Sequence, residues 1–377
     1  MSNKILLTSN ILWGFAFFRI DLIKELIRNG YDVTCAGDID NFSKESINII
    51  ASAGAHIRVL KISRKGINPL REIMYLFNYY RIVKTENPGV IINYSIKPVL
   101  YGSFISYITR IPSVAIFPGL GHAFLKQNIL NSLVKLFYKI CLRVPEKVVF
   151  LNNDDIELFL NENIVSEKKV IYLPSEGINT SEYSPVGKCS NDQKVIFLLI
   201  ARFFWEKGIG EYVEAAKIIK RKYSNVEFQL LGFIDYDNPR AIKIEQINEW
   251  VQDGYINYLG KTDCVKKVIK ETDCVVLPSY YREGVPRSLL EAASMSKPII
   301  TSDTIGCRDV VDDGINGFLC KPKDVKDLVI KLEMMIEMSN EDRIKMGQKG
   351  REKIINKFAV EKVNEVYLNF INNILKS

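Results

Sequence analysis

The amino-acid sequence predicts an α/β protein with two domains, each built on a mostly parallel sheet. At 377 residues the chain is long for one hydrophobic core and suits two. Short apolar runs alternate with helix-like segments along both halves, a pattern typical of parallel strands covered by helices on both faces. A polar segment, 187–193, separates Pro185 from a fresh apolar run, so we expect the domain boundary near residue 185.

The first half alternates from strand to helix throughout. Its first predicted helix carries one apolar stripe and ends at Gly30, a residue type that commonly terminates helices. The predicted strands are 4–8, 31–36, 57–62, 90–93, 113–117, 147–151 and 169–172, and the predicted helices are 17–29, 44–53, 70–85 and 99–109. Residues 9–14 are expected to form a loop between the first strand and the first helix.

The second half repeats the pattern after the polar segment. Its predicted strands are 195–200, 226–231, 256–259, 274–277 and 298–302, and its predicted helices are 209–222, 265–270, 286–295, 325–338, 341–358 and 360–375. The pairs Asp313-Gly314 and Asn316-Gly317 mark tight turns. Pro286 suits the first position of its helix, because the missing N–H of proline costs nothing there.

Composition excludes several classes of protein. The seven cysteines lack metal-ligand or disulfide-framework spacing, so neither a zinc site nor a disulfide scaffold is indicated, and a reduced cytoplasmic location fits. No apolar run is long enough for a membrane-spanning helix, and the N-terminus lacks the features of a signal peptide. Residues 1–183 hold 21 basic and 16 acidic residues, so +5 of the net charge of +7 lies in the first half. This modest excess suits anionic lipid or phosphate, and we expect no nucleic-acid partner.

Ligands of parallel sheets bind at the carboxyl ends of the strands. In the first half that rule selects the loop with Trp13 and Gly14, the stretch 95–98 with Lys97, and the stretch 118–122 with His122. A lone histidine is often structural, yet the position of His122 after a Gly-Leu-Gly turn at a strand end suits catalysis equally well. Both interpretations of His122 stay open.

The segment from Phe124 to Pro145 contains no acidic residue. Its apolar residues alternate with Lys135, Lys139 and Arg143, which are spaced four apart along one helical face. The segment is either a core-packed helix with a solvated basic edge or an amphipathic helix on an anionic membrane surface.

In the second half, charged residues gather after two strands. Arg202 and Lys207 flank the loop after strand 195–200, where a guanidinium fork and an ammonium charge together suit a diphosphate. The stretch 278–291 places Glu283 and Gly284 in a loop and Glu291 on the following helix. A helix N-terminus there provides amide donors and partial positive charge for a phosphate or a sugar.

These residues carry a resemblance to a family. The second half resembles the retaining GT-B-fold glycosyltransferases of group 1 (family 4). The resemblance rests on Ala201-Arg202, Lys207-Gly208, Pro278-Ser279, Glu283-Gly284, Glu291-Ala292, Pro298, Gly306 and the run Asp313–Phe318. The first half looks like the members that build bacterial O-antigen, capsule or lipid-linked glycans, through Phe18-Arg19, Asn68-Pro69-Leu70, Ile96-Lys97-Pro98 and Gly119-Leu120-Gly121.

The resemblance implies two Rossmann-like domains, 1–185 for the acceptor and 186–358 for the nucleotide sugar, facing across a cleft. A C-terminal helix, 359–377, would return to the first domain. Arg202 and Lys207 would hold the diphosphate, Glu291 the ribose hydroxyls, and Glu283 with the backbone of Gly284, Val285 and Pro286 the sugar. In the first domain, Gly14 would approach the diphosphate, His122 would lie near the anomeric carbon, and Arg19 and Lys97 would bind substrate.

The implied reaction is sugar transfer with retention at the anomeric carbon, through front-face attack and without a bound metal. The implied donor is a UDP-sugar, with GalNAc favoured over GlcNAc and galactose, and the implied acceptor is a polyprenyl-diphosphate-linked glycan at the inner face of the cell membrane. Two alternatives stay open. One is a sugar-nucleotide 2-epimerase of the same fold, and the other is a non-catalytic sugar-nucleotide-binding protein.

Overall fold

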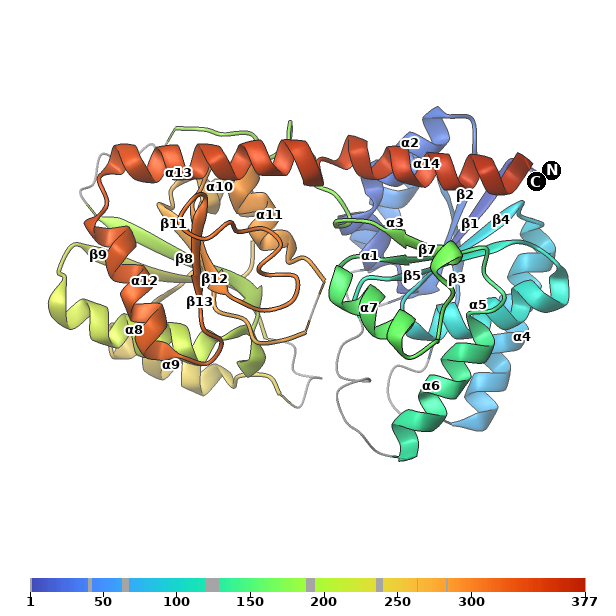
Figure 1. Cartoon of the computed structure of the whole chain (residues 1–377), viewed down its shortest axis with the longest axis horizontal. Coiled ribbons are helices and arrows are strands. Elements are labelled where there is room, and N and C mark those ends of the chain that lie inside the picture. The colour runs from blue at the N-terminus through green and yellow to red at the C-terminus, as the bar shows by residue number, and fades with distance from the viewer. Residues whose placement is uncertain are drawn as a thin grey trace. The chain divides into compact units, whose positions relative to one another are not determined.

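The computed structural model describes residues 2–39, 43–62, 68–119, 129–187, 194–234, 240–262, 264–282 and 284–376. The chain forms two compact units (Figure 1). The first contains Met1–Gly177 and Val360–Ser377, and the second contains Ile178–Ala359. The division therefore falls at Gly177, ahead of the boundary expected near residue 185.

The first unit is built on a seven-stranded parallel sheet with the order β3-β2-β1-β4-β5-β6-β7. The strands are β1 (Lys4–Ile11), β2 (Asp32–Asp38), β3 (His56–Val59), β4 (Val90–Tyr94), β5 (Ser113–Phe117), β6 (Lys147–Phe150) and β7 (Val170–Tyr172). Every residue of β4 and β5 is buried, because helices cover both faces of a parallel sheet.

The helices of the first unit are α1 (Trp13–Phe18), α2 (Ile20–Arg28), α3 (Ser43–Ser52), α4 (Pro69–Glu86), α5 (Ile96–Thr109), α6 (Ile129–Cys141), α7 (Asn153–Asn161) and α14 (Val360–Lys376), with a short 3₁₀ turn at Glu167–Lys169. Asn68 caps α4 by accepting from the amides of Leu70 and Arg71, and Pro69 occupies the first turn.

The start of the chain differs from the prediction in one respect. The segment expected to be one helix over 17–29 is two helices, and the backbone of Arg19 leaves the helical region between them with φ −127°. Gly14 consequently lies inside α1 and is buried, whereas the sequence predicted a loop there. Residues 9–11, also expected in the loop, extend β1.

The C-terminal helix α14 packs on the core of the first unit. Its buried residues Tyr367, Phe370 and Ile371 join the same apolar cluster as strands β1 and β4. The hydroxyl of Tyr94 on β4 donates to the hydroxyl of Tyr367 at 3.1 Å. The predicted return of the last helix to the N-terminal domain is confirmed.

The second unit has a six-stranded parallel sheet with the order β10-β9-β8-β11-β12-β13. Its strands are β8 (Val195–Arg202), β9 (Val226–Phe233), β10 (Asn257–Tyr258), β11 (Cys274–Leu277), β12 (Ile299–Ser302) and β13 (Gly317–Cys320). Its helices are α8 (Ile209–Lys222), α9 (Ile244–Gln252), α10 (Val265–Lys270), α11 (Arg287–Ser294), α12 (Val325–Glu337) and α13 (Asn340–Lys353), with a 3₁₀ turn at Trp205–Lys207 and a π turn at Ile354–Phe358.

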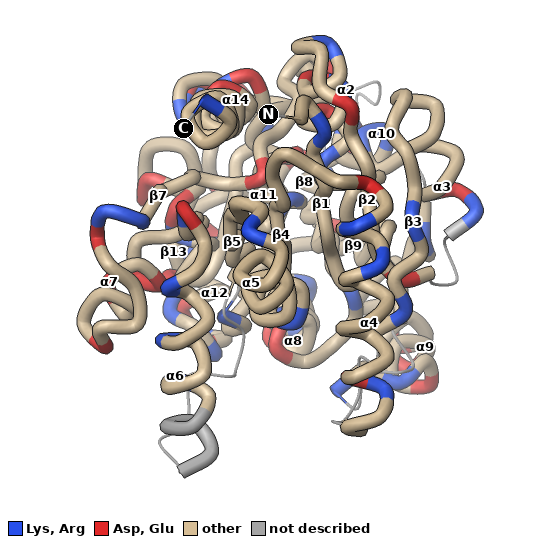
Figure 2. Tube along the Cα trace, turned by 90° about the vertical axis from the view of Figure 1, so that its right-hand side faces the viewer, with Lys and Arg blue, Asp and Glu red and all other residues tan. Residues whose placement is uncertain are grey.

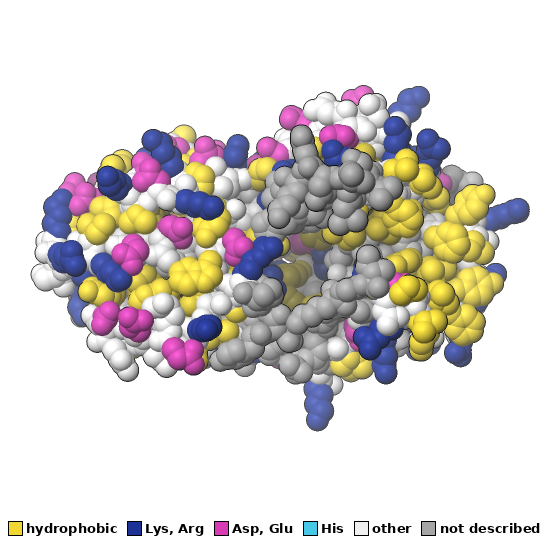
Figure 3. Space-filling view, turned by 90° about the horizontal axis from the view of Figure 1, so that it is seen from below, with side chains coloured by type: hydrophobic (Ala, Val, Ile, Leu, Met, Phe, Trp, Pro, Cys, Tyr) yellow, Lys and Arg dark blue, Asp and Glu magenta, His cyan; other side chains and the backbone are white. Residues whose placement is uncertain are grey.

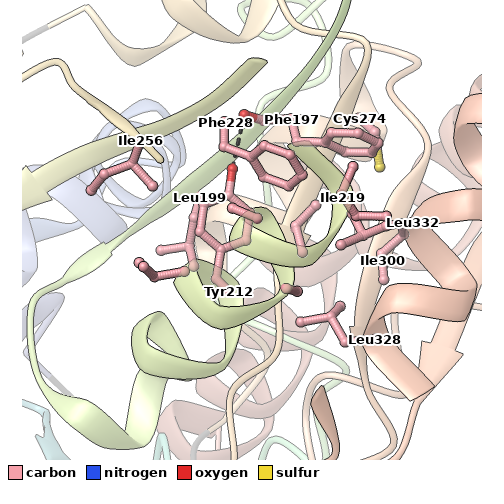
Figure 4. Packing of buried hydrophobic residues seen from close by; sticks show 14 of the residues in the cluster. Phe197, Leu199, Tyr212, Ile219, Phe228, Ile256, Cys274, Ile300, Leu328 and Leu332 are labelled. Atoms are coloured by element: carbon pink, nitrogen blue, oxygen red, sulfur yellow. Dashed lines mark hydrogen bonds between the residues drawn. The ribbon is translucent and has the colours of Figure 1, made fainter. Parts of the chain in front are cut away.

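Aromatic packing anchors α8 to this sheet (Figure 4). The rings of Phe197 on β8 and Phe228 on β9 stack with their centroids 5.1 Å apart. Tyr212 on α8 lies edge-on to Phe228, and its hydroxyl donates to the carbonyl of Phe197 at 2.9 Å. The buried hydroxyl is thus satisfied, and the start of α8 is fixed over β8.

Both strand orders contain a point where the chain reverses its direction of progress across the sheet. In the first unit this point lies between β1 and β4, and in the second it lies between β8 and β11. The loops after two such strands diverge to opposite faces, which opens a crevice for ligands at the carboxyl edge. No helix in the part of the chain that the structure describes is long and apolar enough to cross a membrane.

Candidate functional site

The candidate site of the second unit lies at the carboxyl ends of β8 and β11. These strands are neighbours in the sheet, and their register pairs Cys274 with Phe197 and Val275 with Leu198. The loop 203–208 follows β8 and the loop 278–286 follows β11. The two segments that the sequence selected therefore emerge side by side at the switch point.

Gly208 allows the backbones of the two loops to touch. Its φ is +76°, and a Cβ placed on it would lie 2.1 Å from the carbonyl oxygen of Pro278. Any side chain at this position would meet backbone, which cannot rotate away, and would also be strained by the left-handed conformation. The glycine after Lys207 is thus required by the approach of the loop 278–286.

The carbonyl of Glu206 joins the same two loops by hydrogen bonds. It accepts from the amides of Tyr280 and Tyr281 at 2.9 and 3.1 Å. The hydroxyl of Ser279 donates to it as well, at 3.2 Å. With three donors on one oxygen, the turn before Lys207 is held to the start of the loop 278–286.

Arg202 and Lys207 gather around one aromatic ring. The guanidinium carbon of Arg202 lies 5.5 Å from the centroid of Phe204, and the ammonium nitrogen of Lys207 lies 5.6 Å from it. Lys207 is also 5.7 Å from the ring of Tyr281. Two cations on one ring form a concentrated positive charge at the end of β8. The structure thus brings together the two residues that the sequence selected for one anion.

Helix α11 begins beside these loops, but not as the sequence predicted. Pro286 is the residue before the helix, with ψ +124°, and its carbonyl accepts from the amides of Leu289 and Leu290. The expectation that Pro286 is the first helical residue is wrong, because its extended ψ places the first turn after it. Gly284 and Val285 precede it and are half-buried. Glu283 lies outside the described residues, and its role stays a prediction.

Glu291 is a buried carboxylate on α11. It is 7% exposed, and its Oε1 accepts from Nε of Arg287 at 2.9 Å. Burial raises the pKa of Glu291, while the charge of Arg287 and a hydrogen bond from Tyr183 act in the opposite direction. The predicted ribose contact would therefore be made by a carboxylate whose orientation is fixed by Arg287.

The two residues that contact the carboxylate of Glu291, Arg287 and Tyr183, were not predicted from the sequence. Arg287 stands four residues before Glu291, a spacing that could have indicated a pair on one helical face. Tyr183 lies 108 positions before Glu291, and nothing in the sequence links the two. The carbonyl of Tyr183 accepts from the hydroxyl of Ser294 at 2.7 Å and from Arg351 at 3.2 Å, which ties this segment to α11.

In the first unit, Gly14 and Arg19 form a buried cluster. The guanidinium of Arg19 donates to the carbonyl of Gly14 at 3.2 Å, pairs with Glu176 and lies 4.0 Å from the ring centroid of Tyr94. Burial would lower the pKa of Arg19, but the carboxylate of Glu176 and the side chains of Tyr94 and Tyr367 together raise it. Arg19 is thus a permanently charged group inside the unit, and its contact with substrate stays a prediction.

Lys97 also has a partner within the first unit. It lies in the first turn of α5, and its Nζ is 2.7 Å from Oε1 of Glu72 on α4. The hydroxyl of Tyr101 donates to the other oxygen of Glu72 at 2.7 Å. Burial would raise the pKa of Glu72, but these two donors lower it. His122 lies outside the described residues, so its role stays a prediction.

Comparison with known proteins indicates the class of protein to which the chain is similar. Residues 185–353, which span most of the second unit, match the family described as "Glycosyl transferases group 1". The full-length fold agrees. A glycosyltransferase from Rickettsia africae ESF-5 superposes with a TM-score of 0.81 at 19% identity, over 100% of this chain and 99% of that one. Anabaena Alr3699/HepE in complex with UDP superposes with a TM-score of 0.78 at 15% identity, over 99% and 100%. The prediction of a GT-B-fold glycosyltransferase is confirmed.

Curated relatives narrow the comparison. The N,N'-diacetylbacillosaminyl-diphospho-undecaprenol alpha-1,3-N-acetylgalactosaminyltransferase of Campylobacter jejuni is 28% identical over 336 residues, which cover 85% of this chain and 86% of the relative. The UDP-Gal:alpha-D-GlcNAc-diphosphoundecaprenol alpha-1,3-galactosyltransferase of Escherichia coli is 23% identical over 82% of each chain. The chain is therefore similar to bacterial glycosyltransferases of lipid-linked glycans.

Proposed function

We propose that the protein transfers a sugar from a UDP-sugar to a polyprenyl-diphosphate-linked glycan, with retention at the anomeric carbon. The observation that carries the proposal is the pair Arg202 and Lys207 on the ring of Phe204, next to the loop that leads into α11. This concentrated positive charge at the switch point of a parallel sheet suits a nucleoside diphosphate. The relatives from C. jejuni and E. coli, whose names specify sugar-diphospho-undecaprenol acceptors, support the acceptor class.

In the proposed reaction, the bond between the anomeric carbon and the diphosphate oxygen breaks, and a bond to the acceptor hydroxyl forms on the same face. The acceptor proton passes to the departing phosphate. Arg202 and Lys207 stabilise the negative charge that develops on the diphosphate, which is the largest electrostatic demand of the step. Glu283 binds the sugar hydroxyls and Glu291 the ribose. Neutralisation of the diphosphate charge by Arg202, Lys207 and the start of α11 would make a metal ion unnecessary.

We further propose GalNAc as the transferred sugar and the inner face of the cell membrane as the place of reaction. The name of the C. jejuni relative, an N-acetylgalactosaminyltransferase, supports GalNAc, and the galactosyltransferase of E. coli makes galactose the next candidate. A polyprenyl-linked acceptor is held in the membrane, so the enzyme must work at its surface.

The test is transfer from a panel of radiolabelled UDP-GalNAc, UDP-Gal and UDP-GlcNAc to a polyprenyl-diphosphate disaccharide, with and without a chelator. The proposal predicts an α-linked product from one donor, unchanged by EDTA. Release of a free epimerised sugar without acceptor would replace the transferase by an epimerase. Binding of UDP-sugar without any product would leave a binding protein. Loss of activity in EDTA, restored by manganese, would refute metal independence.

A further inference from the structure

Four large apolar side chains on one face of α4 are exposed to solvent. Leu70, Ile73, Met74 and Phe77 are 73%, 62%, 63% and 60% exposed. Their positions are spaced by three and four residues, so they form a single stripe on the outer face of the helix. The opposite face of α4, with Tyr75 and others, packs into the core. Helix α4 therefore has two apolar faces, one packed on the core and one exposed to solvent.

The stripe continues over two neighbouring helices. Helix α4 contacts α5, and α5 contacts α6 (Figure 1). Six further large apolar side chains on these two helices are at least half exposed: Phe104, Tyr107, Ile108, Leu136, Phe137 and Ile140. We call these six with the four of α4 the apolar face. Figure 3 shows hydrophobic side chains gathered over this part of the first unit. A contiguous exposed area of this kind marks a binding surface.

Acidic residues are missing from the outer side of these helices. Helix α4 has two, Glu72 and Glu86, and both are buried and paired, with Lys97 and Arg58 respectively. The sequence has no Asp or Glu between Glu86 and Glu146, a stretch that includes all of α5 and α6. The side of the unit that carries the apolar face therefore exposes no carboxylate from its three helices.

Basic residues border the apolar face instead. Arg71, Arg81 and Lys84 are exposed on α4, Arg110 directly follows α5, and Lys139 is exposed on α6. Figure 2 marks the basic positions along these helices. Long basic side chains beside an apolar surface can reach the phosphates of a lipid bilayer while the apolar groups enter its acyl region.

We propose that the apolar face docks the first unit onto an anionic lipid bilayer, with α4, α5 and α6 lying in the interface. The apolar face would bring the enzyme to an acceptor that is held in the membrane. This role rests on the proposed function. A second copy of the chain fits less well. A two-fold dimer sets the same patch against itself, so the basic border of one copy would face that of the other. A bilayer offers the opposite charge.

Co-sedimentation of the full-length protein with vesicles tests the proposal. We expect binding to phosphatidylcholine vesicles that contain phosphatidylglycerol, and much weaker binding to phosphatidylcholine alone. The triple variant Phe77→Ser, Tyr107→Ser, Phe137→Ser should lose at least about tenfold in vesicle affinity. Arg81→Gln should lose about fivefold, since each basic residue near an anionic surface contributes a comparable factor.

A matched control changes three exposed isoleucines on helices of the second unit. The triple variant Ile218→Ser, Ile330→Ser, Ile344→Ser removes side chains that are 43%, 52% and 50% exposed. It should bind vesicles like the wild type. Equal binding by both triple variants, or no binding of the wild type to anionic vesicles, would overturn the proposal. So would a dimer that the first triple variant dissociates while vesicle binding stays unchanged.

A second readout separates this proposal from the proposed function. Transfer to a short-chain, water-soluble acceptor does not need a membrane, so the Phe77, Tyr107 and Phe137 variant should retain wild-type rates there. It should lose rate only with acceptor embedded in vesicles. If the wild type transfers no sugar to either acceptor, the proposed function fails, and the vesicle-binding result still decides the docking surface on its own.

Discussion

Gly208→Ala perturbs the candidate site at the point where its two loops touch. The added methyl would lie 2.1 Å from the carbonyl oxygen of Pro278, whereas ordinary contacts begin at 3.4 Å. The loops after β8 and β11 must therefore separate by about 1 Å, which is the scale of misplacement that can cost about 10²-fold in rate. Strain from the positive φ adds about 1–2 kcal/mol to the loss of unfolding free energy.

Gly254→Ala is the matched control for this substitution. Gly254 has nearly the same φ, +74°, but nothing lies within 4 Å of a Cβ built on it. Its variant should lose about 1–2 kcal/mol of unfolding free energy and keep its transfer rate. Denaturant unfolding and initial rates of UDP release, measured on both variants, separate strain from loop displacement. Equal rates in the two variants would refute the claim that contact between these loops shapes the site.

Three further predictions concern single side chains. Lys207→Gln should weaken UDP binding by about tenfold or more in calorimetry, whereas Lys217→Gln, on the exposed side of α8, should not; equal effects would remove Lys207 from the site. Arg287→Met should destabilise the second unit by about 3 kcal/mol or more, because it leaves a carboxylate buried without its cation, and the loss should shrink at acid pH; an unchanged melting temperature at neutral pH would contradict this. Folding lowers the pKa of Glu72, so the ionised Glu72 stabilises the folded state at pH values above the pKa that Glu72 has in the unfolded chain. This stabilisation is lost as the pH falls through the pKa that Glu72 has in the folded protein. Glu72→Gln should therefore flatten the acid side of the stability profile, as should Lys97→Met in part, and a profile identical to the wild type would exclude the pair as a source of acid lability.

The order of strands and helices could be predicted from the sequence because it depends on local patterns. Short, mostly apolar runs such as 90–94 and 274–277 predict buried strands of a covered sheet, and both are found. Helices α7 and α9 and strand β13 were missed. Helix α9 has apolar residues Ile247 and Trp250 three apart, a signal that was available. Strand β13 begins at Gly317, inside a segment whose turn residues predict a loop.

Side-chain partners were far less predictable, since they depend on which distant segments meet. The sequence placed Arg202 and Lys207 together because one short loop connects them. It could not show that Lys97 on α5 pairs with Glu72 on α4, or that Arg19 pairs with Glu176, which lies 157 positions later in the chain. The outward stripe on α4 was also hidden, because its spacing equals that of a buried stripe.

We propose that the end of β8 and the loop after β11 hold the diphosphate of a UDP-sugar for transfer. The most direct measurement is single-turnover transfer from UDP-GalNAc to a polyprenyl-diphosphate disaccharide by the wild type and by Arg202→Gln with Lys207→Gln. We expect an α-linked product and UDP in equal amounts from the wild type, and a rate lower by about 10²-fold or more in the double variant. An unchanged rate in the double variant, or a β-linked product from the wild type, would contradict it.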